Sequence, residues 1–150
     1  MNEMISIVKS IMVAVTGYIS LKLGILAPLF LILFIAMVID YISGMIAAAQ
    51  KGELNSKKGT LGILKKLGFL VTIAVALIVD QLIFYAAQQF GIAVSFVCAF
   101  GVLTTIWLTL NELLSIIENL GEIGVPIPQF LKKVILSLKN SVEKKGEEIE

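Results

Sequence analysis

Residues 25–49 read ILAPLFLILFIAMVIDYISGMIAAA, an apolar run that contains one ionisable residue, Asp40. The hydrocarbon core of a bilayer is about 30 Å thick and is crossed by roughly 20 apolar residues of helix. Thirteen of these residues are Leu, Ile, Val or Phe. Each favours insertion by about 0.3–0.6 kcal/mol, whereas one Asp opposes it by about 3 kcal/mol. We therefore expect residues 25–49 to form a transmembrane helix in spite of Asp40.

Two further apolar runs of sufficient length follow, at residues 67–87 and 92–114. The whole chain of 150 residues is 58% hydrophobic and 15% charged, against roughly 45–50% and about 25% in soluble proteins. A soluble helical bundle is the alternative, but such a bundle rarely contains three runs of this length in so short a chain. The sequence predicts an all-α integral membrane protein with three transmembrane helices in a single domain.

The composition also excludes several classes of function. The chain has no histidine, which is the commonest metal ligand and general acid or base. It has one cysteine, Cys98, and no nucleotide-binding or hydrolase motif. A net charge of +1 argues against nucleic-acid binding. We expect no enzymatic activity, no metal and no cofactor.

Lysines predict the orientation, because short cytoplasmic loops of membrane proteins carry an excess of positive charge. The segment between the first two runs, residues 50–66, is lysine-rich, whereas residues 88–91 between the next two carry no charge. We expect residues 50–66 and the C-terminal tail to face the cytoplasm. The lysines concerned are Lys51, Lys57, Lys58, Lys65 and Lys66 in the segment, and Lys132, Lys133, Lys139, Lys144 and Lys145 in the tail.

Both ends of the chain show amphipathic spacing. Residues 1–22 are expected to form a helix that lies in the membrane interface, with a fourth, less hydrophobic span as the alternative. A signal peptide is disfavoured, because no small-residue cleavage site follows. Glycines and prolines end the third run, and residues 125–150 are expected to form an amphipathic cytoplasmic helix. That helix lies on the inner leaflet, packs on the rest of the protein, or does both.

Ionisable side chains inside spans mark function or helix contacts, and this chain has Asp40, Asp80 and Glu112. Each lies on a stripe of small or polar residues at helical spacing. Such stripes either pack the three helices together or, multiplied by oligomerisation, line a water-filled opening. Three helices alone are too few to surround a wide channel. The residues expected on this seam are Asp40, Gly44, Ala48, Thr72, Ala76, Asp80, Thr105 and Glu112.

Two blocks of sequence resemble the bacteriophage holin family, which also contains the clostridial toxin-secretion holins. The first, DYISGMIAA, begins at Asp40 and leads into GELNSKKG and GILKK; the second, NELLSIIEN, begins at Asn111 and is followed by GVPIP. Together they cover residues 40–131. The motif residues are Gly52, Ser56, Lys57, Gly59, Gly62, Lys65 and Lys66 in the first block, and Asn111, Glu112, Ser115, Glu118, Asn119, Pro126 and Pro128 in the second.

The resemblance implies a non-enzymatic protein of the bacterial cytoplasmic membrane that accumulates and then oligomerises into lesions. Its partners would be the bilayer, further copies of itself and, in some cases, an antiholin, with endolysin or a large toxin as cargo. Met1 and Met4 lie close enough to permit two start sites. Lys65 and Lys66 are expected to pair with Asp40 and Glu112 in a closed state. A small ion channel or carrier, and a membrane adaptor without pore activity, are the competing functions.

Overall fold

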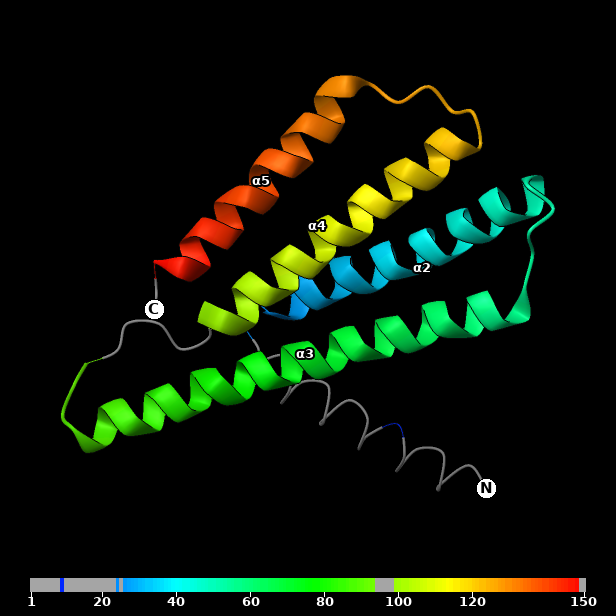
Figure 1. The fold of residues 1–150 in the computed structure, drawn as a ribbon. Coiled ribbons are helices and arrows are strands. Elements are labelled where there is room, and N and C mark those ends of the chain that lie inside the picture. Colours follow the sequence, from blue (N-terminus) through cyan, green and yellow to red (C-terminus); the bar gives the residue numbers. More distant parts are fainter. Residues whose placement is uncertain (1–8, 10–23, 25, 94–98, 149–150) are drawn as a thin grey trace.

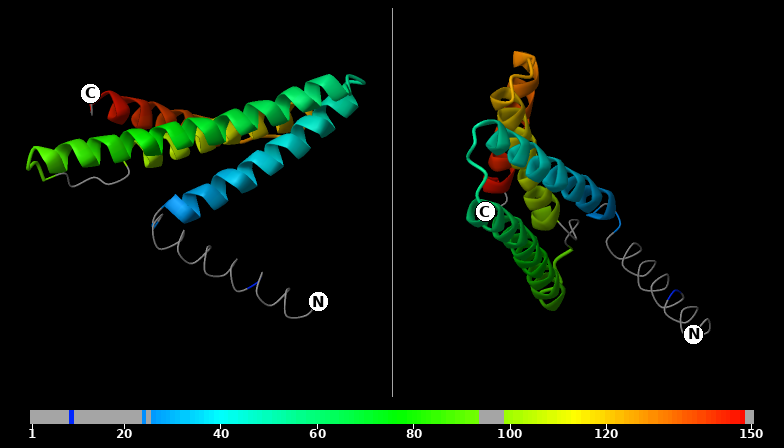
Figure 2. Two further views of the ribbon diagram at one scale, coloured as in Figure 1. Left: turned by 90° about the horizontal axis from the view of Figure 1, so that it is seen from below. Right: turned by 90° about the vertical axis from the view of Figure 1, so that its right-hand side faces the viewer.

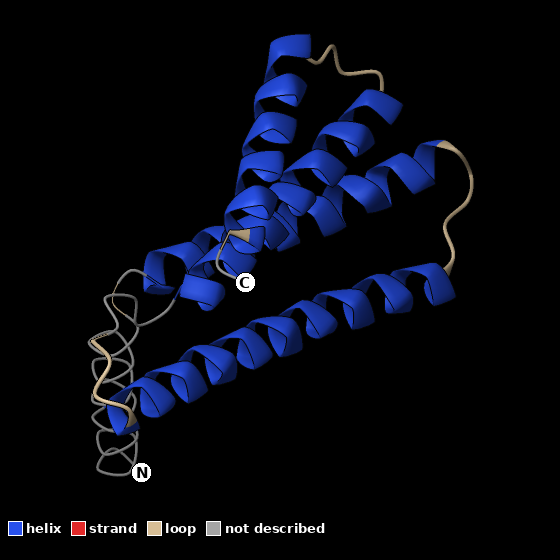
Figure 3. Cartoon of the chain, turned by 60° about the vertical axis from the view of Figure 1, so that its left-hand side comes forward, coloured by secondary structure: helices blue, strands red, loops and turns tan. Residues whose placement is uncertain are grey.

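The computed structural model describes Lys9, Gly24 and residues 26–93 and 99–148. These residues form four helices and no strand: α2 (Leu26–Gln50), α3 (Ser56–Gln89), α4 (Ala99–Glu122) and α5 (Gln129–Glu147) (Figures 1 and 3). The helices α2, α3 and α4 are long and apolar enough to cross a membrane. The predicted all-α class with three candidate spans is confirmed. The helix expected over residues 1–22 lies outside the described residues, apart from Lys9.

Helix α2 begins and ends within one residue of the predicted span, but α3 is longer than expected. Residues 56–66, which we expected to lie in a polar break, form the first three turns of α3. The reason is a local cap: Asn55 is extended and its side chain accepts the backbone N–H of Lys57, at 2.9 Å. Such a cap stabilises a helix start even where lysines and glycines follow.

Helix α4 is shifted along the chain relative to the predicted span of residues 92–114. Ile92 and Ala93 are not helical, and the helix continues to Glu122. It ends at Gly124, whose φ of +90° suits glycine, and the N–H of Val125 bonds back to the carbonyl of Leu120. This left-handed cap closes the helix, whose last residue, Glu122, lies two residues after Leu120.

Helix α4 is the centre of the bundle. It packs against each of the other three helices, whereas α2 and α3 barely touch each other. Helices α2 and α3 converge at the loop of residues 51–55 and diverge from there (Figure 2). The link of residues 123–128 lies at the same end of the molecule (Figure 1). One buried cluster joins the three candidate spans: Leu33 and Met37 of α2, Ile73 of α3 and Leu108 of α4.

The outward faces of α2 and α3 are walls of exposed apolar side chains. Phe34 on α2 is 62% exposed, and Val71 on α3 is 63% exposed. Apolar surface this extensive is rare on monomeric water-soluble proteins. The walls suit contact with hydrocarbon, and the ionisable groups Asp40, Lys66 and Asp80 of the same helices lie on the inward side.

We predict that Leu108→Ala lowers the free energy of unfolding by roughly 2–5 kcal/mol, because it opens a cavity between three helices. Leu31→Ala removes the same atoms from an exposed position on α2 and should have a much smaller effect. Unfolding of both variants in detergent micelles, followed by circular dichroism, measures the difference. Equal losses would contradict this assignment of the core.

Candidate functional site: an ionic cluster at the centre of three helices

Asp40, Lys66 and Glu112 meet between α2, α3 and α4. The 51–55 loop and the 123–128 link lie at one end of the bundle (Figure 1). Counted from that end, each of the three residues lies ten residues into its helix. At 1.5 Å per residue this is about 15 Å into the bundle. The three positions are far apart in sequence but stand at one level, so their side chains can meet across the bundle.

The Lys66 ammonium bridges the two carboxylates. Its Nζ lies 2.9 Å from Oδ2 of Asp40 and also bonds Oε2 of Glu112. The side chain of Lys66 is only 13% exposed, that of Asp40 is 16% exposed and that of Glu112 is 6% exposed. One positive charge against two negative charges gives the group a formal charge of −1. Buried charges are costly without partners. Each of the three helices therefore needs the charged side chains of the other two at this level of the bundle.

Asn119 of α4 extends the cluster toward α2. Its Nδ2 lies 3.0 Å from Oδ1 of Asp40 and 3.0 Å from Oγ of Ser43. The amide lies close against Gly44 of α2, where an added Cβ would be in van der Waals contact with that nitrogen, at 3.4 Å. The sequence marked Asn119 only as a motif residue. Its spacing of seven residues from Glu112 places both on one face of α4, which is the signal that indicates the contact.

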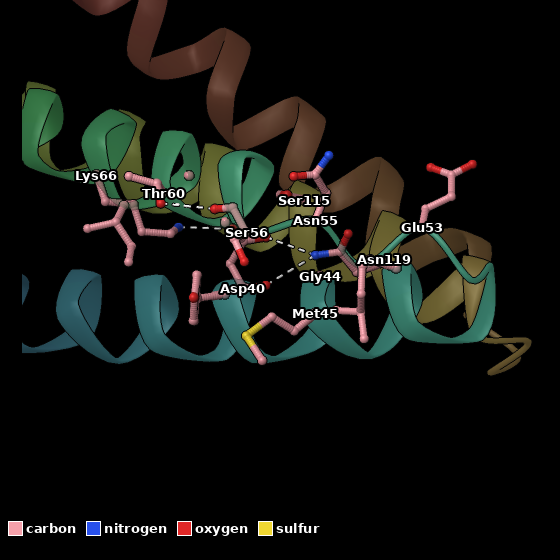
Figure 4. Close-up of a pocket in the computed structure, with 16 residues that line it drawn as sticks. Asp40, Gly44, Met45, Glu53, Asn55, Ser56, Thr60, Lys66, Ser115 and Asn119 are labelled. Atoms are coloured by element: carbon pink, nitrogen blue, oxygen red, sulfur yellow. Dashed lines mark hydrogen bonds and ion pairs between the residues drawn. The ribbon is translucent and has the colours of Figure 1, made fainter.

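A cavity of about 650 Å³ lies beside the cluster, between α2, the 51–55 loop and α3, with α4 behind it (Figure 4). It extends from the loop to the ion pair of Asp40 and Lys66. The motif residues therefore surround a real opening, although they come from three helices. Those that line it are Asp40, Gly44, Ala48, Ser56, Gly59, Gly62, Lys66, Ser115 and Asn119.

Asp80 forms a second, separate polar contact at the other end of α4. Its Oδ1 accepts the backbone N–H of Phe100 at 3.0 Å, and its Oδ2 accepts that of Gly101 at 2.7 Å. A carboxylate here satisfies free N–H groups and complements the helix dipole. A Cβ at Gly101 would lie 2.5 Å from a methyl group of Leu77, so a larger residue here would force the Leu77 side chain to shift. Asp80 of α3 thus caps α4.

The other expected seam residues are distributed unequally. Thr105 is fully buried, and its hydroxyl donates to the carbonyl of Gly101 at 2.7 Å. Ala76 is half-buried. Thr72 is exposed and bonds Gly68 of its own helix, so the structure places it on the outward wall rather than in the helix contact.

Several motif residues lie outside the cluster. Gly52 is in the loop with a φ of +67°, and the Lys57 and Lys65 side chains are exposed. Of the two lysines expected to pair with the acids, Lys66 is therefore the one at the cluster. The remaining residues of the second block lie toward α5: Asn111 is half-buried, Glu118 is 3.8 Å from Lys132, Pro126 is in the link, and Pro128 precedes α5.

Comparison with known proteins places this chain among a set of bacterial relatives. The family model described as the bacteriophage holin family matches residues 17–140. An uncharacterised protein of Halalkalibacterium halodurans is 35% identical over 113 residues, which cover 75% of this chain and 79% of the relative. One from Listeria innocua is 35% identical over 123 residues, 82% of this chain and 78% of the relative. One from Clostridium perfringens is 33% identical over 108 residues, 72% and 73% of the two chains. No solved structure matches the chain.

We predict that Lys66→Met destabilises the protein by about 3–5 kcal/mol, because it leaves two carboxylates buried without their cation. Adding Glu112→Leu and Asp40→Leu to that variant should recover most of the loss. Lys65→Met, at the exposed neighbouring position, is the matched control. Unfolding in detergent micelles measures all of them, and a harmless Lys66→Met would show that the ion pairs contribute nothing.

We predict that Asp80→Ala frays the start of α4 and costs about 0.5–2 kcal/mol, the usual range for loss of a helix cap. Hydrogen exchange of the amides of Phe100 and Gly101 should accelerate, while amides near Glu112 keep their protection. Gln81→Ala, at the next and exposed position of α3, should leave both unchanged. Unaltered exchange in Asp80→Ala would argue against the cap.

Proposed function

This chain belongs to the bacteriophage holin family, a family of non-enzymatic membrane proteins, and from this membership we propose that it acts as a holin. Copies oligomerise in the bacterial cytoplasmic membrane and open a pore or lesion through which endolysin, or a large toxin as in the toxin-secretion holins that the sequence resembles, leaves the cell. Family membership and three apolar helices make it a multi-pass membrane protein. An antiholin is a further proposed partner, and the cargo passes through the lesion without binding tightly.

One observation carries the proposal: the ionisable groups Asp40, Asp80 and Glu112 of the spans are turned inward and satisfied, while the outward walls are mainly apolar. Lys66 is shared by Asp40 and Glu112, and Asn119 bonds Asp40. A single copy arranged in this way presents mainly hydrocarbon-like surface to lipid. We propose that this is the closed state.

In the proposed open state the seam residues face water instead of the neighbouring helices of the same copy. Carboxylates, hydroxyls and the lysine exchange their internal hydrogen bonds for hydration, which costs little because water supplies equivalent partners. The apolar walls of α2 and α3 stay against lipid. A wide opening needs many copies, and closed rings are the usual assembly.

The proposed orientation follows from the lysines. The 51–55 loop and the 123–128 link lie at one end of the bundle (Figure 1), and the lysines at 51, 57, 58, 65 and 66 lie in or near that loop. We propose that this end faces the cytoplasm and that the apolar residues of α5 contact the inner leaflet. The cavity would then open toward the cytoplasm.

A small oligomeric ion channel is the second candidate function. The cavity reaches the ion pair of Asp40 and Lys66, and the cluster carries a formal charge of −1, which favours cations. Such a channel would pass ions without any lytic role.

Release from liposomes separates these functions. Reconstituted protein should release dextrans of protein size if it is a holin, and only small ions if it is a channel. A membrane adaptor that recruits a soluble partner predicts no leakage. In cells, co-expression with an endolysin should give abrupt lysis, and release of ions alone would overturn the holin proposal.

We predict that Asp40→Leu and Glu112→Leu each bring forward the onset of lysis. Each removes one of the two carboxylates that hold Lys66 in the closed state. Glu147→Leu removes a carboxylate from an exposed position on α5 and should leave the onset unchanged. Culture turbidity after induction at matched protein levels measures the onset, and normal timing in both variants would mean that the seam only packs the helices.

A further inference from the structure

Helix α5 runs antiparallel along α4 in a defined register. Lys132 lies 3.8 Å from Glu118, and the indole N–H of Trp107 donates to Glu143 at 2.8 Å. The two pairs are eleven residues apart on each helix, so the helices stay in register for about 16 Å. The Lys139 ammonium also lies 5.1 Å from the centre of the Trp107 ring, within the range of a cation–π contact.

Apolar side chains also pack between α5 and the same face of α4. Ile135 of α5 is buried in a cluster with Leu110 and Ile117 of α4, and Leu113 and Leu114 pack against it. Helix α5 therefore covers one face of α4 along about half of that helix.

This position of α5 conflicts with an upright α4 in a bilayer. Trp107 lies fifteen residues from the end of α4 at Glu122, about 22 Å along the helix axis, in a hydrocarbon core about 30 Å thick. Lys139 and Glu143 would be carried to that depth, and the charged residues at 144–148 to the far side. Charges within the hydrocarbon core are costly, so the resting arrangement with α5 on α4 suits a copy whose α4 is not upright. Helix α5 has to leave as α4 becomes upright.

Helix α5 has a surface that suits another location. Phe130, Leu131, Val134 and Leu138 are exposed in the structure, and lysines flank them. A helix of this kind binds at the interface of an anionic leaflet. The link of residues 123–128 contains Gly124 in the left-handed region and two prolines, so it ends α4 and starts α5 as separate units.

Departure of α5 uncovers Trp107 and Leu114. With Asn111 and the already exposed Glu118 they form one stripe on α4, at i, i+4, i+7 and i+11. Its indole, amide and carboxyl groups are a poor surface for lipid, and polar groups of this kind bond across contacts between membrane helices. We propose that α5 is a removable cover, and that the uncovered stripe is the contact between the α4 helices of two copies of this chain. The inference rests on the proposed function only in requiring assembly.

Disulfide cross-linking in membranes tests the contact. Full-length protein with Cys98→Ser and Leu114→Cys is expressed, and the membranes are oxidised with copper phenanthroline. We expect a disulfide-linked dimer. The matched control is Val71→Cys in the same background, an exposed position on the lipid-facing wall of α3, which should give far less dimer.

A second variant tests the cover. Glu143→Ala removes the acceptor of Trp107 and should raise the initial rate of Leu114→Cys cross-linking about fivefold, the effect of losing one hydrogen bond. Lys145→Ala changes the same helix at a residue that pairs with Glu148 of α5 itself, and it should leave the rate unchanged. An unchanged rate in Glu143→Ala would overturn the cover.

Lysis of cells that co-express an endolysin separates failure of this inference from failure of the proposed function. If the Leu114→Cys protein lyses cells and stays monomeric on oxidation, α4 is not the contact and the inference is overturned while the function stands. If it neither cross-links nor lyses cells, although the Cys98→Ser parent lyses them, Leu114 matters for assembly in another way and the proposed contact is again wrong. If the parent also fails to lyse cells, the proposed function fails first.

Discussion

A lysine ammonium held between two carboxylates in the middle of apolar helices constrains how the three helices around it are arranged. Lys66 reaches both Asp40 and Glu112, and none of the three is well solvated at that depth. The Coulomb attraction within the group mainly offsets the cost of removing these charges from water. Its larger consequence is specificity, because only one mutual level of α2, α3 and α4 satisfies all three charges.

Apolar packing alone would not set that level. Between helices in lipid, leucine and isoleucine contacts resemble the lipid contacts that they replace, so close-packed small residues and polar bonds determine the arrangement. Helix α4 is held at two such points: Asp80 caps its beginning, and Glu112 and Asn119 bind near its other end. This explains why α4 is central, while α2 and α3 barely touch each other and leave a cavity between them near the loop.

Much of the fold could be predicted because long apolar runs have few alternatives in water. The ionisable residues of the spans were also evident, since each is unusual in its surroundings. The helical start of α3 was missed because a lysine- and glycine-rich segment resembles a loop, and the decisive cap by Asn55 is a single hydrogen bond. Thr72 was assigned to the seam because a stripe on one helix does not say which neighbour it faces. The structure turns it outward.

The sequence by itself determined the class of protein, the approximate spans and the charged residues that require partners, because these depend on composition and on spacing along one helix. The tertiary structure alone decided which partners they find: Lys66 rather than Lys65, Asn119 with Asp40, Asp80 with the start of α4, and Trp107 with α5. Such pairings depend on the crossing and relative shift of whole helices. The crossing and shift of the helices are set by the sum of many contacts and cannot be predicted from a local sequence pattern.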